Sequence, residues 1–566
     1  MLFAFIRWIR AQWISVGLYL SKLPGRLLGL YSAGLSTIYA PQLGDAAPFN
    51  SHDAGEVDLE LQDAGPVAST FLLDHRGFPL TTPEQDDELI TTFIESIDSD
   101  AVCALASRYN HCKPCRVVHR TNGSFNVCFF VKFDNDDLRW IVRIPIIPSL
   151  HKPWQKLLSE VATLQFLERK TRIPVPRVLA YGCDAKLSQT DSRVRIFLIL
   201  SFIPGEALNK KDLLEAPKEH RTAFYSQLID IFVDLRRLEF PLIASLMPNP
   251  DGSPAPVMGP VMSMTANTFR QSLPTFSSTK EYLARQSLLI QEQFQSPVPD
   301  ITVTDIEHEI FVLHHLEAVL YQAIDPDLDR GPFILNHLDL RSTNIIVDSR
   351  LHIQGIIDWE FSSTVPRQFF TPPSWITAHD SIKTSKEMHI DFCQVLTEKS
   401  RTDSRCEELR REWYDPAYQD KSGIGHPDLT FCIAHLMRRP EDAIYTFYEY
   451  FSPRLYAKSM GDVASEFLKE NEACFAEVRR RVEQNEKYTQ YLKDNDLYVQ
   501  SLQEKWLAES AIFMAKLKAK EAHRASVEKD TRPSGGGEAA EGNSGIETTD
   551  TWIDAIYDHG EGKRSC

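Results

Sequence analysis

Runs of β-branched and aromatic residues, separated by short polar turns, dominate the chain between residues 115 and 205. Polar turns at residues 121–124 and 134–137 separate the first three runs, which predicts an antiparallel meander. A later segment with two prolines is extended, and an apolar run stops at Pro204-Gly205. The pattern predicts one helix before residue 205 and five strands, over residues 117–118, 125–133, 140–147, 172–181 and 195–202.

The helix predicted in this region covers residues 157–170. Its apolar face is made of Leu157, Val161, Leu164 and Leu167. Glu160 falls on the same face, where a carboxylate is costly unless it has a partner. Arg143, on the preceding strand, is an available cation, and we expect the two to form an ion pair. The alternative is that Glu160 lies at the edge of the apolar face and stays solvated.

The rest of the chain is mainly helical in pattern. Helical periodicity recurs over residues 224–238 and 306–320, and the six prolines between Pro241 and Pro260 predict a loop between them. A long amphipathic helix is predicted over residues 483–524, and the Gly- and Ser-containing segment at 532–545 predicts a disordered tail over 527–566.

The first 60 residues form a hydrophobic and basic leader. No acidic residue precedes Asp45, and Arg7 and Arg10 interrupt the apolar run, which makes it a poor membrane-spanning helix. Three interpretations stay open: a mitochondrial transit peptide, an amphipathic anchor with weak membrane contact through residues 1–40, or a disordered leader. The location is therefore cytoplasmic or mitochondrial.

Charge and cysteine content narrow the class of protein. The formal net charge of −17 argues against a general nucleic-acid-binding protein, so we expect no nucleic-acid partner. Ten cysteines at irregular spacing in 566 residues do not form a disulfide framework, which favours a reducing compartment.

The chemistry-bearing residues gather between residues 333 and 361. His337, Asp339 and Asn344 follow a short apolar run, and two short strands joined by a turn at residues 348–350 separate Asn344 from Asp358. A hairpin would bring Asn344 and Asp358 together, with Asp339 on the loop that leads in. Such hard oxygen ligands suit Mg²⁺, and the remaining carboxylate could orient an attacking hydroxyl. These are the components of phosphoryl transfer.

The order H-x-D-x-x-x-x-N, two hydrophobic strands and I-I-D-W-E resembles the phosphotransferase family of aminoglycoside phosphotransferases and choline kinases. That family shares the protein-kinase-like fold, and the resemblance covers residues 100–450 and points to its fungal-type members. It implies an α+β, two-lobed fold with a small antiparallel β N-lobe at 85–205, a larger mainly helical C-lobe at 206–480, and a long C-terminal helical extension at 481–526.

The resemblance also implies roles for individual residues. Asp339 takes the place of the catalytic base, and His337 supports the same catalytic loop. Asn344 and Asp358 take the place of the Mg²⁺ ligands. The positions that correspond to the site of ATP or GTP are Asn122, Gly123 and Ser124 in the phosphate-covering loop, Arg143 with its helix partner Glu160, and Leu200 and Phe202 in the adenine-binding linker. The other partner is a small-molecule acceptor with a hydroxyl group.

Some positions depart from the family pattern. Leu338 stands where many relatives have glycine, Arg143 replaces a lysine, and Leu-Arg-Ser-Thr precedes Asn344. A pseudokinase or nucleotide-sensing binding module is therefore the alternative to an active kinase. A protein kinase is disfavoured because D-F-G and A-P-E are not recognisable. The acceptor pocket would involve the Pro-rich loop and the helices after Ser374, with Trp375, Asp380 and Trp413 as candidate contacts.

Overall fold

The computed structural model describes residues 71–134, 137–188, 193–377, 386–415, 427–456 and 458–499. The chain divides into two compact units, Met1–Leu497 and Tyr498–Cys566, and every element described below lies in the first. The leader, the tail and the predicted extension beyond residue 499 lie outside the described residues. Within the part of the chain that is described, no helix is both long and apolar enough to cross a membrane.

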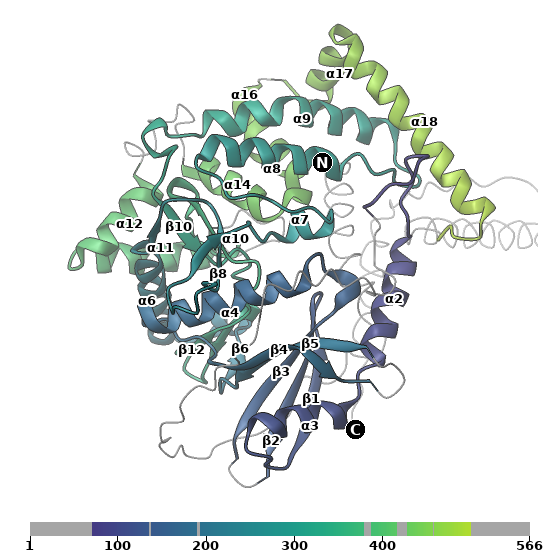
Figure 1. Cartoon of the computed structure of the whole chain (residues 1–566). Helices are drawn as coiled ribbons and strands as arrows, with labels where there is room; N and C mark the ends of the chain where they lie inside the picture. Colours follow the sequence, from purple (N-terminus) through teal and green to yellow (C-terminus); the bar gives the residue numbers. More distant parts are fainter. Residues whose placement is uncertain are drawn as a thin grey trace, which may run out of the picture. The chain divides into compact units, whose positions relative to one another are not determined.

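A five-stranded antiparallel sheet forms the N-terminal lobe (Figure 1). Its strands, in the spatial order β1-β2-β3-β5-β4, are β1 (Cys115–Asn122), β2 (Asn126–Phe133), β3 (Arg139–Pro145), β5 (Val194–Ser201) and β4 (Val178–Lys186). The prediction of five strands is confirmed, and so is the meander of the first three. Strand β4 begins six residues later than the extended segment predicted from residue 172.

Alternation along β3 gives the sheet two different faces. Trp140, Val142 and Ile144 pack in the cluster that lies against α3 (Ser99–Tyr109). The intervening Arg143 pairs in register with Leu198 of β5, whose side chain belongs to the cluster beneath α4 (Pro153–Lys170). The sheet therefore holds an arginine on the face that meets the rest of the molecule.

Two helices before the sheet were not predicted. They are α2 (Pro83–Glu95) and α3, so three α-helices, rather than one, lie between residues 71 and 205 of the described chain. Thr82 and Gln85 form a capping box at the start of α2, and Val102, Leu105 and Ala106 of α3 are buried against the sheet. The Thr-Pro-x-Gln sequence is an N-terminal helix signal, so the start of α2 was predictable from the sequence.

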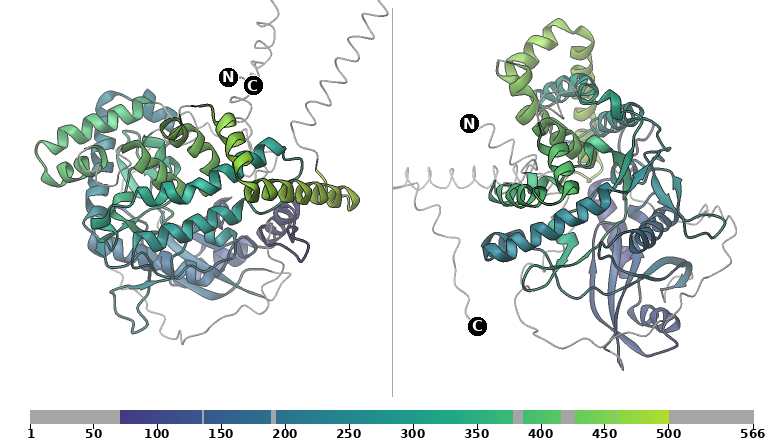
Figure 2. Two further views of the ribbon diagram at one scale, coloured as in Figure 1. Left: turned by 90° about the horizontal axis from the view of Figure 1, so that it is seen from above. Right: turned by 90° about the vertical axis from the view of Figure 1, so that its left-hand side faces the viewer.

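The C-terminal lobe is mainly helical, as predicted. The right-hand view of Figure 2 shows its teal and green helices on one side and the purple-to-blue strands on the other. Its longer helices are α6 (Lys218–Arg236), α8 (Thr279–Gln293), α9 (Val303–Gln322), α11 (Lys386–Ser400), α12 (Ser404–Tyr414), α14 (Pro427–Arg438), α17 (Met460–Glu470) and α18 (Glu472–Asp494).

Two predictions for this lobe need correction. Between Pro241 and Pro260 the chain forms a hairpin of β8 (Ser245–Met247) and β9 (Val257–Gly259), because both three-residue strands are free of proline. The predicted helix over 483–524 instead begins at Glu472 and ends at Asp494. It ends in a Schellman-type turn, with Asp496 at φ 56° and the Leu497 N–H bonded to the Leu492 carbonyl at 2.9 Å.

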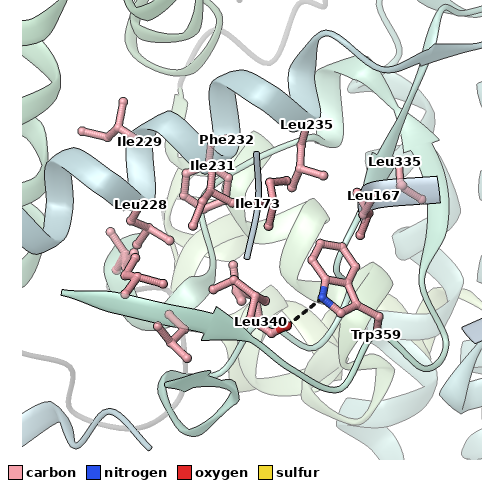
Figure 3. Packing of buried hydrophobic residues seen from close by; sticks show 14 of the residues in the cluster. Leu167, Ile173, Leu228, Ile229, Ile231, Phe232, Leu235, Leu335, Leu340 and Trp359 are labelled. Atoms are coloured by element: carbon pink, nitrogen blue, oxygen red, sulfur yellow. Dashed lines mark hydrogen bonds between the residues drawn. The ribbon is translucent and has the colours of Figure 1, made fainter. Parts of the chain in front are cut away.

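Three short strands carry the central segment. They are β10 (Phe333–Asn336), β11 (Ile345–Val347) and β12 (Ile353–Ile356), and β11 and β12 form the predicted antiparallel hairpin. The hairpin packs on a core shared with α4 and α6. Figure 3 shows Leu167, Phe232 and Trp359 in this core, with the Trp359 indole bonded to the Ile356 carbonyl at 3.0 Å. Trp359 thus anchors the segment after β12 in this core.

Candidate functional site

Hydrogen bonds hold the segment around Asp339 to the segment that ends in Asp358. The His337 ring bonds the Ile357 carbonyl at 2.9 Å, and the Ile357 N–H donates to the Asn344 carbonyl at 2.9 Å. The Asn344 side-chain amide donates to the Asp339 carbonyl at 2.8 Å. The structure therefore brings His337, Asp339, Asn344 and Asp358 together, as the sequence predicted.

Asp358 leaves β12 in an unusual backbone conformation. Its φ is 67°, in the left-handed region, and that of Phe361 is 59°. Such residues cost of order 1–3 kcal/mol and often lie at functional sites. The turn directs the Asp358 carboxylate towards the N-terminal lobe, where Arg143 donates to it at 2.8 Å.

Arg341 is a site residue that sequence reasoning missed. Its guanidinium pairs with the Asp339 carboxylate at 2.7 Å, and the Asp339 side chain is 15% exposed. Arg341 lies in the short loop between Asp339 and Asn344, so the Leu-Arg-Ser-Thr sequence already contained the signal for this ion pair. Arg341 holds the carboxylate in position.

A buried charge cluster lies between the lobes. The predicted Arg143–Glu160 ion pair is present, and Glu160 is 3% exposed, so the solvated alternative is wrong. Arg143 also contacts Asp358 and, at 3.3 Å, Glu360. Lys156, which is 1% exposed, pairs with Glu360. Five ionisable groups, three acidic and two basic, thus share one largely buried site.

The charges in this cluster act on one another. Burial alone would lower the pKa of Arg143, but the attraction of Glu160, Asp358 and Glu360 raises it well above its ordinary value. Arg143 is therefore a permanent cation at this site. It lies on the strand-three position at which the family resemblance expects a phosphate-binding residue.

Lys156 and Glu360 were also missed from the sequence. Lys156 lies four residues before Glu160 on α4, so the two share a helix face, and this spacing was a usable signal. Glu360 stands two residues after Asp358 and also accepts a bond from the Asn126 side chain at 2.7 Å. Its partners come from β2, β3 and α4, and no local pattern joins them.

The β1–β2 turn contains the candidate phosphate-covering residues. Asn122 and Gly123 are exposed, and Ser124 is partly buried. The Gly123 N–H is bonded to the Asn126 carbonyl at 3.0 Å, and no atom lies within 4 Å of the position that a Cβ would take. Phe125 packs edge-on against Phe361 at 5.0 Å between ring centroids. The turn is an ordinary hairpin with open space beside its glycine.

The candidate linker residues lie at the end of β5. Leu200 is 3% exposed and pairs in register with Ile141, while the partly buried Phe202 follows the strand. The Phe202 ring lies beneath the Arg139 guanidinium, 5.5 Å from it, and 6.2 Å from the Phe130 ring. Leu200 therefore faces the same cluster as the α4 side chains, two residues along β5 from Leu198, which pairs with Arg143.

The candidate acceptor contacts do not form one surface. Trp375 and Trp413 are buried, and their indoles bond the Leu340 and Phe370 carbonyls at 2.8 and 2.7 Å. They are core residues that hold loops, and Trp375 supports the loop next to Asp339. Asp380 lies outside the described residues.

The oxygen atoms at the site fit a magnesium ion. The Asn344 nitrogen is used by the Asp339 carbonyl, which leaves Oδ1 as the ligand atom, and Asp358 supplies a carboxylate. Within the described ranges, no group of three or more His, Cys, Asp or Glu side chains could hold a metal. Mg²⁺ does not require one, because it commonly uses one or two carboxylates together with phosphates and water.

Substituting His337 should change how stability depends on pH. Burial lowers the pKa of this histidine below its ordinary 6.5, so the folded protein holds the ring neutral. Below about pH 6.5 the unfolded chain takes up a proton that the folded chain excludes, so the free energy of unfolding falls as the pH falls. We expect His337→Gln to weaken this dependence in urea titrations between pH 5 and 8.

His151 and His315 also have lowered pKa values, and they provide a background common to both proteins. The difference between the wild-type and variant slopes therefore isolates His337. Identical slopes in the two proteins would contradict the assignment of a neutral, structural ring.

Comparisons with known proteins bear on this geometry. Residues 122–369 match the model of the phosphotransferase enzyme family. The match covers less than half of the chain. The matched segment begins at Asn122 in the β1–β2 turn and extends past Asp358, so it contains every residue of the predicted site. The α+β architecture implied by the resemblance, with an antiparallel N-terminal sheet followed by a mainly helical lobe, is present.

Two relatives are similar in sequence to parts of the chain. The clavilactone A biosynthesis cluster protein Y of Ampulloclitocybe clavipes is 29% identical over 233 residues, which is 40% of this chain and 54% of that protein. The altered inheritance of mitochondria protein 9 of Meyerozyma guilliermondii is 31% identical over 114 residues, 20% of this chain and 18% of that protein. The chain thus spans about half the length of the first relative and less of the second.

Solved structures of phosphotransferases are similar only at low scores. The ADP-bound aminoglycoside phosphotransferase APH(2'')-Ib has 13% identity and a TM-score of 0.34, covering 62% of this chain and 99% of that one. The GDP and kanamycin complex of a second aminoglycoside phosphotransferase has 15% identity and the same score, covering 66% and 98%. Scores this low are too weak to support a conclusion about this chain.

Proposed function

We propose that the protein is a small-molecule kinase that transfers the γ-phosphate of ATP or GTP, with Mg²⁺, to a hydroxyl group of its acceptor. The observation that carries the proposal is the hydrogen-bonded arrangement that joins the Asp339 loop to the Asp358 segment. It holds Asp339 and Asn344 to the segment of Asp358, and Asp358 in turn is paired with a permanent cation, Arg143. Positioning and charge are what phosphoryl transfer requires from a protein.

Each residue has a role in this proposal. Asp339, held by Arg341, accepts the proton of the acceptor hydroxyl. The hydroxyl oxygen of the acceptor then bonds to the γ-phosphorus, and the nucleoside diphosphate leaves. Asn344 and Asp358 would hold Mg²⁺, which neutralises charge on the phosphates when bound. Arg143 faces the phosphates, and His337 supports the loop.

The nucleotide is expected to lie beneath the sheet. Leu200 and Phe202 lie at the end of β5, the strand that pairs with Arg143 through Leu198, and an adenine or guanine base would lie against them with its phosphates near Arg143. The exposed Asn122 and Gly123 and the adjoining Ser124 would cover the phosphates from above, and the open space beside Gly123 supports this role.

Mg²⁺-dependent nucleotide binding should raise the thermal stability of the wild-type protein, and Asp358→Asn should abolish that increase. A ligand that binds only the folded state stabilises it by about 2.7 kcal/mol at 100 times its Kd. The measurement is a melting-temperature titration with ATP and GTP, with and without Mg²⁺, accompanied by an assay of nucleotide consumption over a panel of hydroxyl compounds.

The matched control is Asp348→Asn, which makes the same change in the partly exposed β11–β12 turn. It should respond to nucleotide as the wild type does. The proposal would be contradicted if the wild-type protein is folded and no nucleotide stabilises it. A nucleotide response without turnover of any acceptor would instead favour the pseudokinase or nucleotide-sensing alternative.

A further inference from the structure

A second group of polar side chains lies beside the Asp339 loop, on the side of the helical lobe. A narrow hollow there is lined by Tyr282 of α8, Asn336 of β10 and Arg438 at the end of α14, with Leu338, Phe369 and Met437 among the apolar side chains. Asn336 and Leu338 flank His337, so the hollow adjoins the segment that carries Asp339. None of the residues that line it is acidic.

Arg438 is an uncompensated cation. Its guanidinium donates to the carbonyl and the hydroxyl of Thr371, both at 3.2 Å, and among the described residues it forms no ion pair with a carboxylate. Burial lowers the pKa of Arg438 to about 10, against the weaker opposing influence of Tyr282 and Asp339. A guanidinium in this position still carries its charge at neutral pH, at a cost in desolvation that an anion would offset.

Asn336 provides a second, independent indication. It is 4% exposed, and its side-chain nitrogen is buried without a hydrogen-bond partner. Leaving a buried donor unpaired costs roughly 1–3 kcal/mol, so such groups are usually hydrogen-bonded to a ligand or to water. The Tyr282 side chain, 2% exposed, completes a lining that can donate hydrogen bonds.

We propose that the acceptor carries an anionic group, a carboxylate or a phosphate, which binds Arg438 and Asn336 while its hydroxyl faces Asp339. This inference rests on the proposed kinase function and names its class of substrate. The acidic net charge of the chain is compatible with a cationic acceptor, but the local charge of this hollow has the opposite sign.

The dimensions of the hollow limit what enters it. Its volume is about 10 Å³, near the least that holds one water molecule. A carboxylate or phosphate group is larger than one water molecule, so only such a terminal group of the acceptor would enter, and its entry requires the flexible Met437 side chain to move aside.

The test measures anion binding with the nucleotide site already filled. The full-length protein is saturated with ADP and Mg²⁺, and its melting temperature is followed against D-glycerate, glycerol 3-phosphate and neutral glycerol at constant ionic strength. We expect at least one of the two anions to raise the melting temperature, and glycerol to have no such effect. The glycerate and glycerol 3-phosphate arms distinguish a carboxylate site from a phosphate site.

Variants assign the effect to the hollow. Arg438→Gln should weaken the apparent affinity for the anion by about 10-fold to 100-fold, the range expected for hydrogen bonds to charged groups. Asn336→Asp, which replaces a donor by a negative charge at nearly constant shape, should abolish the response. Arg439→Gln is the matched control, because Arg439 follows directly in the chain and its side chain is 38% exposed.

Each variant is compared with its own melting temperature without anion, so a general loss of stability does not imitate the result. An equal anion response in wild type, Arg438→Gln and Asn336→Asp would overturn the inference. It would also be overturned if neither anion acted on a protein that ADP and Mg²⁺ do stabilise. Failure of the nucleotide itself to stabilise the wild type would instead count against the proposed kinase function.

Discussion

Asp339→Asn should lower kcat by about 10²–10⁴-fold, the usual contribution of a positioned general base, while leaving nucleotide binding nearly unchanged. The substitution keeps the size of the side chain and removes its ability to take a proton. The Asn344 amide donates to the backbone carbonyl of residue 339, so the loop keeps its attachment. The measurement is steady-state phosphoryl transfer to an acceptor, together with an ADP titration of both proteins.

Asp348→Asn again serves as the control, because it makes the same chemical change in the turn of the hairpin that follows the Asp339 loop. It should retain wild-type kcat. Normal turnover by Asp339→Asn would remove this residue from the role of base. Loss of nucleotide binding together with turnover would show that the substitution had disturbed the loop instead.

The central segment could be predicted because its determinants are local. Strand-forming runs at residues 345–347 and 353–356, joined by a tight turn, have one natural pairing, and that pairing brings Asn344 beside Ile357. The sheet of the N-terminal lobe was predictable for the same reason. Strands β1, β2, β3 and β5 contain runs of β-branched and other apolar residues bounded by turns, whereas β4 was predicted only from an extended segment with two prolines.

Other features depend on contacts between distant segments, which one sequence does not reveal. Glu360 is in the same short motif as Asp358, yet its importance comes from Asn126 and Lys156, which are 234 and 204 residues away. Arg438 lines a hollow with Tyr282 and Asn336, and no spacing in the chain relates these three residues. The acceptor side of the site was therefore the least predictable part.

Some errors had a different cause, because the local signals were present. The capping box at Thr82 and Gln85 marks the start of α2, and the chain shows a stop at Asn495-Asp496 within the long predicted helix. A count of prolines favoured a loop over 241–260, although two three-residue runs there contain none. Composition averaged over a window concealed these short signals.

Because Lys156 belongs to the buried charge cluster, we expect its substitution to have a large effect on stability. Replacing this residue by Met should lower the free energy of unfolding by about 3–5 kcal/mol, the cost of breaking a buried ion pair from one side. The change would leave Glu160, Asp358 and Glu360 to share one cation, Arg143, in a site where Glu160 and Glu360 are buried. Urea denaturation at neutral pH measures the effect.

Lys170→Met is the matched control, because it makes the same substitution at the exposed end of the same helix and should change stability little. Adding Glu360→Gln to Lys156→Met should recover part of the loss, since the amide can still accept the bond from Asn126 without carrying a charge. If Lys156→Met costs no more than Lys170→Met, the cluster does not stabilise the protein through Lys156. If the double variant is less stable than either single variant, uncompensated charge on Glu360 is not the cause of the loss.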